Sequence, residues 1–153
     1  FICGISESGQ DKKLHALLEG LGVTGIGGRV SAGYGKFHVV QKLCLNTPSD
    51  AQTKWLRRAL SANRAPYLLL TTSLPQADEL DSALKDASFQ LVRRSGFMAS
   101  DCVETPLKKK TQYALAAGSV LRHSYQGALY DVSLTDTHPA YRYSKPIFMG
   151  VTL

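Results

Sequence analysis

The residues best able to do chemistry gather in a glycine-rich segment in the first quarter of the sequence. Residues 20–35 hold seven of the 13 glycines. Glycine allows positive φ angles, and a glycine-rich backbone exposes amide groups that bind phosphate oxygens. An arginine in such a loop adds a bidentate phosphate donor. The segment therefore predicts a phosphate-binding loop whose candidate residues are Gly25, Gly27, Gly28, Arg29, Ser31, Gly33, Tyr34, Gly35 and Lys36.

Two familiar nucleotide-binding motifs do not fit this glycine-rich segment. A dinucleotide fingerprint follows a strand and opens a helix, whereas this segment follows an expected helix and precedes an expected strand. A P-loop needs Ser or Thr after Gly-Lys, but Phe37 follows Gly35-Lys36. The run 33–35 partly matches the RNA-recognition signature, without its leading basic residue and one aromatic. A tight turn that serves only packing stays open as the structural alternative.

A second group of basic and aromatic residues lies near the C-terminal end of the sequence. Aromatic rings stack on unpaired bases, and cations neutralise phosphates. In an alternating strand, Tyr141 and Tyr143 would share one face, with Arg142 on the other. A strand with a buried tyrosine face is the structural alternative. The candidate RNA-binding residues of this group are His138, Arg142, Tyr143 and Lys145.

The charge of the chain favours a polyanionic partner. With 18 basic and 12 acidic residues, the formal net charge is +6. Residues 76–86 hold four of the acids, so the rest of the chain is still more basic. A basic surface beside one acidic helix indicates nucleic acid on one side and a basic protein on another. The run Lys108–Lys110 either reaches phosphates or is simply solvated.

The four histidines do not form a recognisable catalytic or metal-binding pattern. General acid–base cleavage of RNA needs such groups in fixed mutual geometry near a cation. The spacing of His15, His38, His123 and His138 fixes no such geometry and matches no set of zinc ligands. We therefore expect no catalytic residue, no metal site and no cofactor.

The cysteines and the hydropathy pattern indicate a reducing, cytoplasmic setting. Cys3, Cys44 and Cys102 contain no C-x-x-C pair, so we expect buried free thiols rather than disulfides or a zinc knuckle. No apolar run approaches the roughly 20 residues that span a bilayer, and the first ten residues lack the pattern of a signal peptide. No membrane contact is expected.

The elements that must position these residues are read from periodicity and from turn residues. Helices are expected at 11–21, at 47–65 with Trp55 in the core, and at 77–87. Residues 99–112 are expected to form a loop. Strands are expected at 1–5, 36–40, 67–74, 88–92, 113–121, 128–134 and 146–151.

This order of elements predicts an α+β fold of ferredoxin-like units with antiparallel sheets. The first unit, residues 1–46, contains only the later part of such a fold and is incomplete. A connecting helix follows at 47–65, and a second, degenerate unit occupies 66–153.

Several segments also resemble a known family. The run GIGGRVSAGYGKF is similar to the glycine-rich loop of the RAMP superfamily of CRISPR-associated proteins, which are built from RRM-type ferredoxin-like units. The later segments resemble the C-terminal part of the Csm-complex subunit 4 family of type III-A systems. They are RRSGFM (93–98), TPLKKKTQYALAAGSV (105–120), GALYDVS (127–133) and HPAYRYSKPIFMGV (138–151).

The resemblance implies a non-catalytic RNA-binding subunit of a cytoplasmic ribonucleoprotein in antiviral defence. Its partners would be the 5′ tag of the CRISPR RNA (crRNA), the large polymerase-like subunit and the backbone RAMP subunit. Target RNA would be contacted only indirectly. The sequence departs from the family pattern at Ser144, where a glycine is expected, and family members are longer than this chain.

Two other functions stay open. A repeat-processing endoribonuclease would use His15 or His38 in cleavage. A pure protein–protein adaptor would dock a basic partner through Asp78, Glu79 and Asp81.

Overall fold

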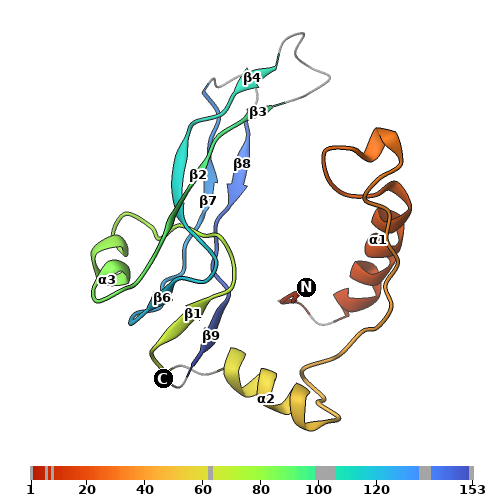
Figure 1. Cartoon of the computed structure of the whole chain (residues 1–153), viewed down its shortest axis with the longest axis horizontal. Coiled ribbons are helices and arrows are strands. Elements are labelled where there is room, and N and C mark those ends of the chain that lie inside the picture. Colours follow the sequence, from red (N-terminus) through yellow and green to blue (C-terminus); the bar gives the residue numbers. More distant parts are fainter. Residues whose placement is uncertain are drawn as a thin grey trace. The chain divides into compact units, whose positions relative to one another are not determined.

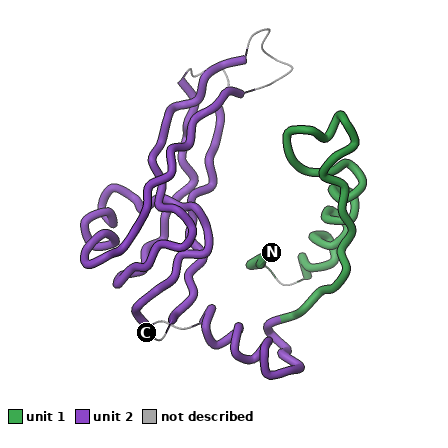
Figure 2. The backbone as a smooth tube through the Cα atoms, in the orientation of Figure 1, with its two compact units in different colours: residues 1–44 green, residues 45–153 purple. Residues whose placement is uncertain are grey.

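The structure, a computed structural model, describes residues 2–5, 7, 9–61, 64–98, 106–134 and 139–151. It divides the chain into two compact units (Figure 2). Unit 1 is Phe1–Cys44, and unit 2 is Leu45–Leu153. The domain ranges expected from the sequence stay a prediction.

Unit 1 contains the helix α1 (Gln10–Thr24) and the short 3₁₀ helix η1 (Val30–Ala32), which lies in the loop that follows (Figure 1). The expected helix at 11–21 is confirmed and is longer at both ends. Asp11 in its first turn complements the positive end of the helix dipole. The expected strand at 36–40 is wrong, because these residues find no ladder partner among the described residues.

Unit 2 begins with the helix α2 (Ala51–Leu60). Asp50 caps it by accepting a hydrogen bond from the Thr53 amide at 2.8 Å, and the Thr53 hydroxyl accepts one from the Asp50 amide at 3.3 Å. This reciprocal capping box fixes the first turn. The helix buries Thr53 and Ala59. The expectation that Trp55 lies in the core is wrong, since 61% of this residue is exposed.

The core of unit 2 lies between a three-stranded antiparallel sheet and the helix α3 (Leu80–Leu84). The central strand β1 (Tyr67–Leu69) pairs with β6 (Val120–Leu121) and β9 (Phe148–Gly150). The buried residues of this core come from the sheet, from α3 and from neighbouring segments. The core cluster is Leu69, Ala83, Leu115, Leu121 and Tyr125.

An arm of paired strands extends from this core (Figure 1). In it, β2 (Leu91–Arg94) pairs with β5 (Gln112–Leu115), and β3 (Phe97–Met98) pairs with β4 (Leu107–Lys108). A second hairpin joins β7 (Leu129–Asp131) to β8 (Tyr141–Tyr143). All three pairs are antiparallel.

These strands correct several sequence-based boundaries. The expected loop at 99–112 contains β4 and the first residue of β5, while 99–105 lies outside the described residues. The expected strand 113–121 is two strands, because a turn with Gly118 at φ 94° interrupts it. The strands expected at 67–74, 128–134 and 146–151 exist but are shorter.

The structure confirms a mixed α+β chain with small antiparallel sheets. The finer assignment to ferredoxin-like units stays a prediction. Within the ranges that the structure describes, no helix combines the length and the apolarity needed to cross a membrane.

Candidate nucleic-acid interface

Backbone hydrogen bonds close the glycine-rich loop at its base. The Ile26 amide donates to the Gly35 carbonyl at 3.0 Å, and the Phe37 amide donates to the Gly22 carbonyl at 3.1 Å. A side chain at Gly22 or Gly35 would collide with the backbone of the opposite segment. At Gly25, an added Cβ would lie 2.9 Å from the Tyr34 carbonyl oxygen. These glycines permit the close approach of two backbone segments.

The tip of the same loop is open. An added Cβ at Gly27, Gly28 or Gly33 would meet no atom within 4 Å. Gly27 and Gly33 have φ angles of 104° and 82°, which favour glycine. Within the described part of the chain, the amides of Gly27, Gly28 and Arg29 have no hydrogen-bond acceptor. Backbone amides without an acceptor in a glycine-rich turn are suited to an anion.

Arg29 has an anchored backbone and a free side chain. Its carbonyl accepts hydrogen bonds from the amides of Ala32 and Tyr34, at 3.1 and 3.3 Å. Its guanidinium has no ion pair or hydrogen bond among the described residues. Ser31, Tyr34 and Lys36 are also exposed. The loop thus presents a cation, a hydroxyl and an aromatic ring beside the unpaired amides.

The β7–β8 hairpin presents its tyrosines to solvent and turns its arginine inward. Tyr141 and Tyr143 are 62% and 71% exposed, so the alternative of a buried tyrosine face is wrong. Arg142 is half-buried. Its Nη1 donates to the Arg94 carbonyl at 3.0 Å and to the Gln112 Oε1 at 3.2 Å. The guanidinium of Arg142 therefore links the hairpin to β2 and β5.

Residues on either side of β8 complete this group. Lys145 is exposed, whereas Ser144 is buried. The Ser144 amide donates to the Ala128 carbonyl at 3.0 Å, and its carbonyl accepts from the Leu74 amide at 3.1 Å. Ser144 has no positive φ, so the departure from the expected glycine causes no backbone strain. His138 lies outside the described residues.

The predicted RNA-binding residues thus form two groups. The loop residues from Gly25 to Lys36 come together in unit 1, and residues 142–145 come together in unit 2. Each group is a local surface of its own unit.

Glu79 holds the base of the β7–β8 hairpin. Its carboxylate accepts hydrogen bonds from the amides of Gln76, Gln126 and Gly127 at 2.9, 2.7 and 3.1 Å. Burial, the largest single influence, raises the pKa of Glu79, but the three amides together bring it below the ordinary value. The adaptor hypothesis placed Glu79 at a docking surface, whereas the structure commits this carboxylate to the fold.

The arm exposes four side chains in two cross-strand pairs, and the sequence analysis considered only Lys108 among them. Arg93 lies directly opposite Tyr113, and Phe97 lies directly opposite Lys108. Tyr113 and Phe97 are 58% and 65% exposed. The sequence feature that could have indicated this surface is the basic and aromatic composition of 93–97 and 108–113, which flank one polar segment.

The histidines and cysteines form no catalytic arrangement in the described ranges. His15 Nε2 lies 3.8 Å from Glu19 Oε1, and His38 and His123 are exposed. No cluster of three or more His, Cys, Asp or Glu residues with metal-binding geometry occurs among the residues that the structure places. Contrary to the expectation of burial, Cys3 and Cys44 are exposed; Cys102 lies outside the described residues.

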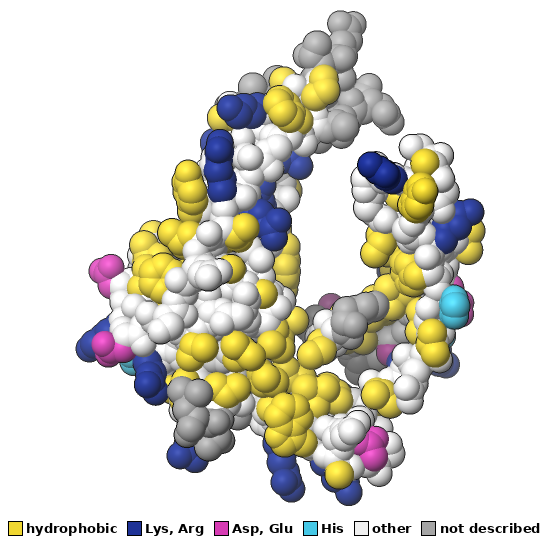
Figure 3. Space-filling view, viewed as in Figure 1, with side chains coloured by type: hydrophobic (Ala, Val, Ile, Leu, Met, Phe, Trp, Pro, Cys, Tyr) yellow, Lys and Arg dark blue, Asp and Glu magenta, His cyan; other side chains and the backbone are white. Residues whose placement is uncertain are grey.

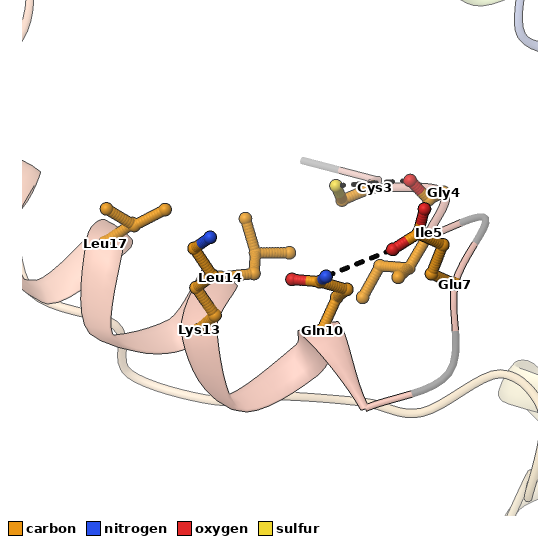
Figure 4. A pocket seen from close by; sticks show the side chains of 8 residues that line it. All are labelled: Cys3, Gly4, Ile5, Glu7, Gln10, Lys13, Leu14 and Leu17. Atoms are coloured by element: carbon orange, nitrogen blue, oxygen red, sulfur yellow. Dashed lines mark hydrogen bonds between the residues drawn. The ribbon is translucent and has the colours of Figure 1, made fainter.

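A shallow cleft in unit 1 offers no better candidate (Figure 4). It lies between residues 3–5 with Glu7 on one side and the first turns of α1 on the other. Gln10 Nε2 donates to Glu7 Oε2 at 3.2 Å inside it, and the Cys3 thiol lies 3.8 Å from the Gly4 carbonyl. No side-chain base stands hydrogen-bonded to that thiol in the described chain.

Comparisons with known proteins agree with the resemblance seen in the sequence. Residues 62–151 match the family model of the CRISPR Csm4 C-terminal domain. The chain is 39% identical over 131 residues to the CRISPR system Cms protein Csm4 of Mycobacterium tuberculosis, which covers 85% of this chain and 40% of that protein. It is 32% identical over 138 residues to the protein of the same name from Streptococcus thermophilus, covering 88% of this chain and 43% of that one.

The family model covers more than half of the chain, although the chain spans only about 40% of the length of the curated relatives. The match includes the core sheet, the arm and the β7–β8 hairpin, while the glycine-rich loop lies before it. The chain therefore belongs to the Csm4 family of CRISPR-associated proteins, and residues 62–151 correspond to the C-terminal domain of that family.

Proposed function

We propose that this chain is a non-catalytic RNA-binding part of a type III CRISPR Csm complex and holds the 5′ tag of the crRNA. The observation that carries the proposal is the open tip of the glycine-rich loop. There, the unpaired amides of Gly27, Gly28 and Arg29 lie beside a guanidinium without a partner among the described residues. This combination suits a phosphate group of an RNA backbone.

The two parts of the loop have different roles in this proposal. The base glycines hold the two backbone segments together, while the tip keeps amides without an acceptor among the described residues. Arg29 and Lys36 supply positive charge, Ser31 a hydroxyl, and Tyr34 an exposed ring. RNA would thus meet a preformed site rather than order a mobile one, which reduces the entropic cost of binding.

The hairpin group contributes a second contact to RNA. Tyr143 and Lys145 are exposed and offer a stacking surface and a cation. Arg142 contributes by holding the hairpin through its contacts with Arg94 and Gln112. His138 stays a candidate from the sequence.

Membership of the family supports the remaining partners and the setting. We assign to the whole protein, of which this chain covers a part, docking of the large polymerase-like subunit and of the backbone RAMP subunit in the cytoplasm. Contact with target RNA is indirect. The two ferredoxin-like units expected from the sequence, the first incomplete, belong to the same proposal.

The test is fluorescence anisotropy of labelled crRNA with an intact or a scrambled 5′ tag, over a series of salt concentrations. We expect preference for the intact tag and uncut RNA on a denaturing gel. The logarithm of affinity should fall by about 0.7 per neutralised phosphate for each tenfold rise in salt. Arg29→Ala should weaken binding, and Arg29→Lys should restore only part of it, because a lysine cannot bind phosphate in bidentate fashion.

The same experiment separates the alternatives. Defined cuts that vanish in His15→Ala or His38→Ala would replace this proposal with an endoribonuclease. Equal affinity for both RNAs would favour the adaptor. The adaptor would then be examined with Asp78→Lys and Asp81→Lys, because Glu79 is committed to backbone amides.

A further inference from the structure

We propose that the solvent-facing side of the β2–β5 and β3–β4 strand pairs in the arm of unit 2 is a further contact surface for single-stranded RNA, distinct from the loop and the β7–β8 hairpin. Two cross-strand pairs, each with one cation and one aromatic ring, form this surface. They are Arg93 with Tyr113, and Lys108 with Phe97. The inference rests on the proposed function, because it takes RNA as the partner, but it names a surface far from the glycine-rich loop in sequence.

The alternation of side chains along the arm turns both pairs to solvent. The neighbouring pair Val92 and Ala114 lies on the opposite side of the β2–β5 ribbon, and Ala114 is buried. The pair Met98 and Leu107 is likewise turned inward, with Met98 only 4% exposed. Because successive residues of a strand point to opposite faces, the cation–aromatic pairs occupy the outer face.

A bulge between the two cross-strand pairs keeps both of them on the same face of the arm. Between the pairs Arg94–Gln112 and Phe97–Lys108, one strand has two residues and the other has three. Gly96, in the two-residue stretch, has a φ of 137°, and its carbonyl accepts a hydrogen bond from the Lys109 amide in the three-residue stretch at 2.8 Å. Arg93 and Phe97 are four residues apart, so alternation alone keeps them on one face. Tyr113 and Lys108 are five apart, and the extra residue returns Lys108 to the face of Tyr113.

The charge of the arm identifies the partner as a polyanion. In the described ranges 91–98 and 106–115, which contain the β2–β5 and β3–β4 pairs, the chain has five Lys or Arg residues and no Asp or Glu. Arg93 and Lys108 have no ion pair among the described residues. Figure 3 shows basic side chains gathered along this arm, with hydrophobic side chains between them. A protein partner would have to be strongly acidic to match this surface.

The exposed rings favour unpaired bases over a duplex. A phosphate backbone needs only the cations, whereas Tyr113 and Phe97 leave more than half of their surface in water. Each ring can stack on one base, and this contact tolerates any base because every base has a π-face. Along the strands, Arg93 and Phe97 are separated by four residues, about 13 Å at 3.3 Å per residue. The two rings therefore take separate nucleotides.

The test uses the 153-residue chain and a single-stranded RNA that carries 2-aminopurine, free or annealed to its complement. The double variant Phe97→Leu/Tyr113→Leu removes both rings but keeps apolar side chains. The matched control, Tyr113→Phe, keeps the ring. We expect the double variant to weaken single-strand binding by at least about tenfold. Duplex binding and the thermal midpoint should change little, and Tyr113→Phe should bind like the original chain.

The outcomes separate this proposal from the loop proposal. Unchanged single-strand affinity in the double variant, or equal losses for single strand and duplex, would overturn the stacking surface. If Arg29→Ala then still weakens binding, the loop proposal stands alone. If the double variant loses affinity while Arg29→Ala does not, the arm surface stands and the loop proposal fails.

Discussion

The glycine-rich loop and the β7–β8 hairpin both combine arginine, lysine and tyrosine, yet they use these residues in opposite ways. In the loop, the backbone makes the structure, and the Arg29 side chain has no partner in the described chain. In the hairpin, the Arg142 side chain makes the structure, and the tyrosines remain exposed. Two segments of similar composition thus offer different groups to a ligand: a guanidinium in the loop and tyrosine rings in the hairpin.

The difference shows that a basic residue is a good RNA candidate only when its own chain leaves it unpaired. A guanidinium that already donates to a carbonyl and an amide oxygen, as Arg142 does, must break those bonds to reach a phosphate. Arg29 has no such cost. Loss of Arg142 should therefore appear first in stability, and loss of Arg29 first in affinity.

The largest expected effect comes from disrupting the packed base of the glycine-rich loop. Gly35→Val places a side chain against the Ile26 backbone at a residue whose φ is 80°. Both the collision and the dihedral disfavour any side chain there, so the loop should open and RNA binding should be lost. Amide hydrogen exchange of residues 22–37 would show the opening.

The matched control for that change is Gly28→Ala. Gly28 has no positive φ and no neighbour within 4 Å of an added Cβ, so the loop should keep its structure. Protection from exchange that is equally reduced in both variants would contradict the division into a packed base and an open tip.

The next effect separates the two arginines. Arg142→Ala leaves the Arg94 carbonyl and the Gln112 side chain without their partner, and should cost about 1–3 kcal/mol in the free energy of unfolding. Arg29→Ala should leave that free energy within about 0.5 kcal/mol of the original, because it removes only exposed contacts. Urea unfolding, followed by circular dichroism, measures both changes. Equal destabilisation by the two variants would contradict the distinction between a structural Arg142 and an unpaired Arg29.

Acid should loosen the hairpin base before it affects the loop. The folded pKa of Glu79 lies below its ordinary value of 4.5, so its stabilising contribution is complete above that value. The contribution is lost as the pH falls through the folded pKa. Nuclear magnetic resonance of the Gln126 and Gly127 amides, followed from pH 7 to pH 3, would report the loss.

Glu79→Gln should remove most of this pH dependence and lower stability at pH 7, because the neutral amide offers only one acceptor oxygen. Asp81→Asn is the control, since Asp81 is exposed in the first turn of α3, which begins directly after Glu79. A pH dependence that survives in Glu79→Gln but disappears in Asp81→Asn would contradict the assignment.

The smallest effect concerns the exposed ring of Tyr143. Tyr143→Leu should reduce RNA affinity about fivefold through the loss of one stacking contact, with stability nearly unchanged. Tyr143→Phe should have no effect on either quantity, because it keeps the ring. Titrations of the two variants in parallel provide the measurement, and a strong loss of affinity in Tyr143→Phe would indicate that the hydroxyl rather than the ring makes the contact.

Local patterns predicted much of the fold. The leucine spacing of 14–21 and the short apolar run after Pro66 correctly indicated α1 and β1. Trp55 was placed in the core because apolar periodicity does not reveal which face of a helix is covered. The expected strand at 36–40 failed for a related reason, since a strand depends on a ladder partner that its own sequence does not specify.

The sequence predicted which residue types make up the candidate sites, but not which of their side chains are left unpaired by the fold. The sequence selected Arg29 and Arg142 on equal terms, because residue type does not show which guanidinium the fold engages. Glu79 looked like part of an acidic surface, and only the turn at Gln126 and Gly127 shows why it is needed. The cross-strand pairs of the arm depend on register, which two short strands separated by a bulge do not reveal in sequence.

The most direct test of the central claim compares the affinities of the original chain and of Arg29→Ala for crRNA with intact and scrambled 5′ tags, across the salt series. The account predicts preference for the intact tag, a steep salt dependence, and in Arg29→Ala a weaker affinity with a shallower salt slope. Identical affinities and slopes for the two proteins would contradict it, because the open loop tip would then make no contact with the RNA backbone.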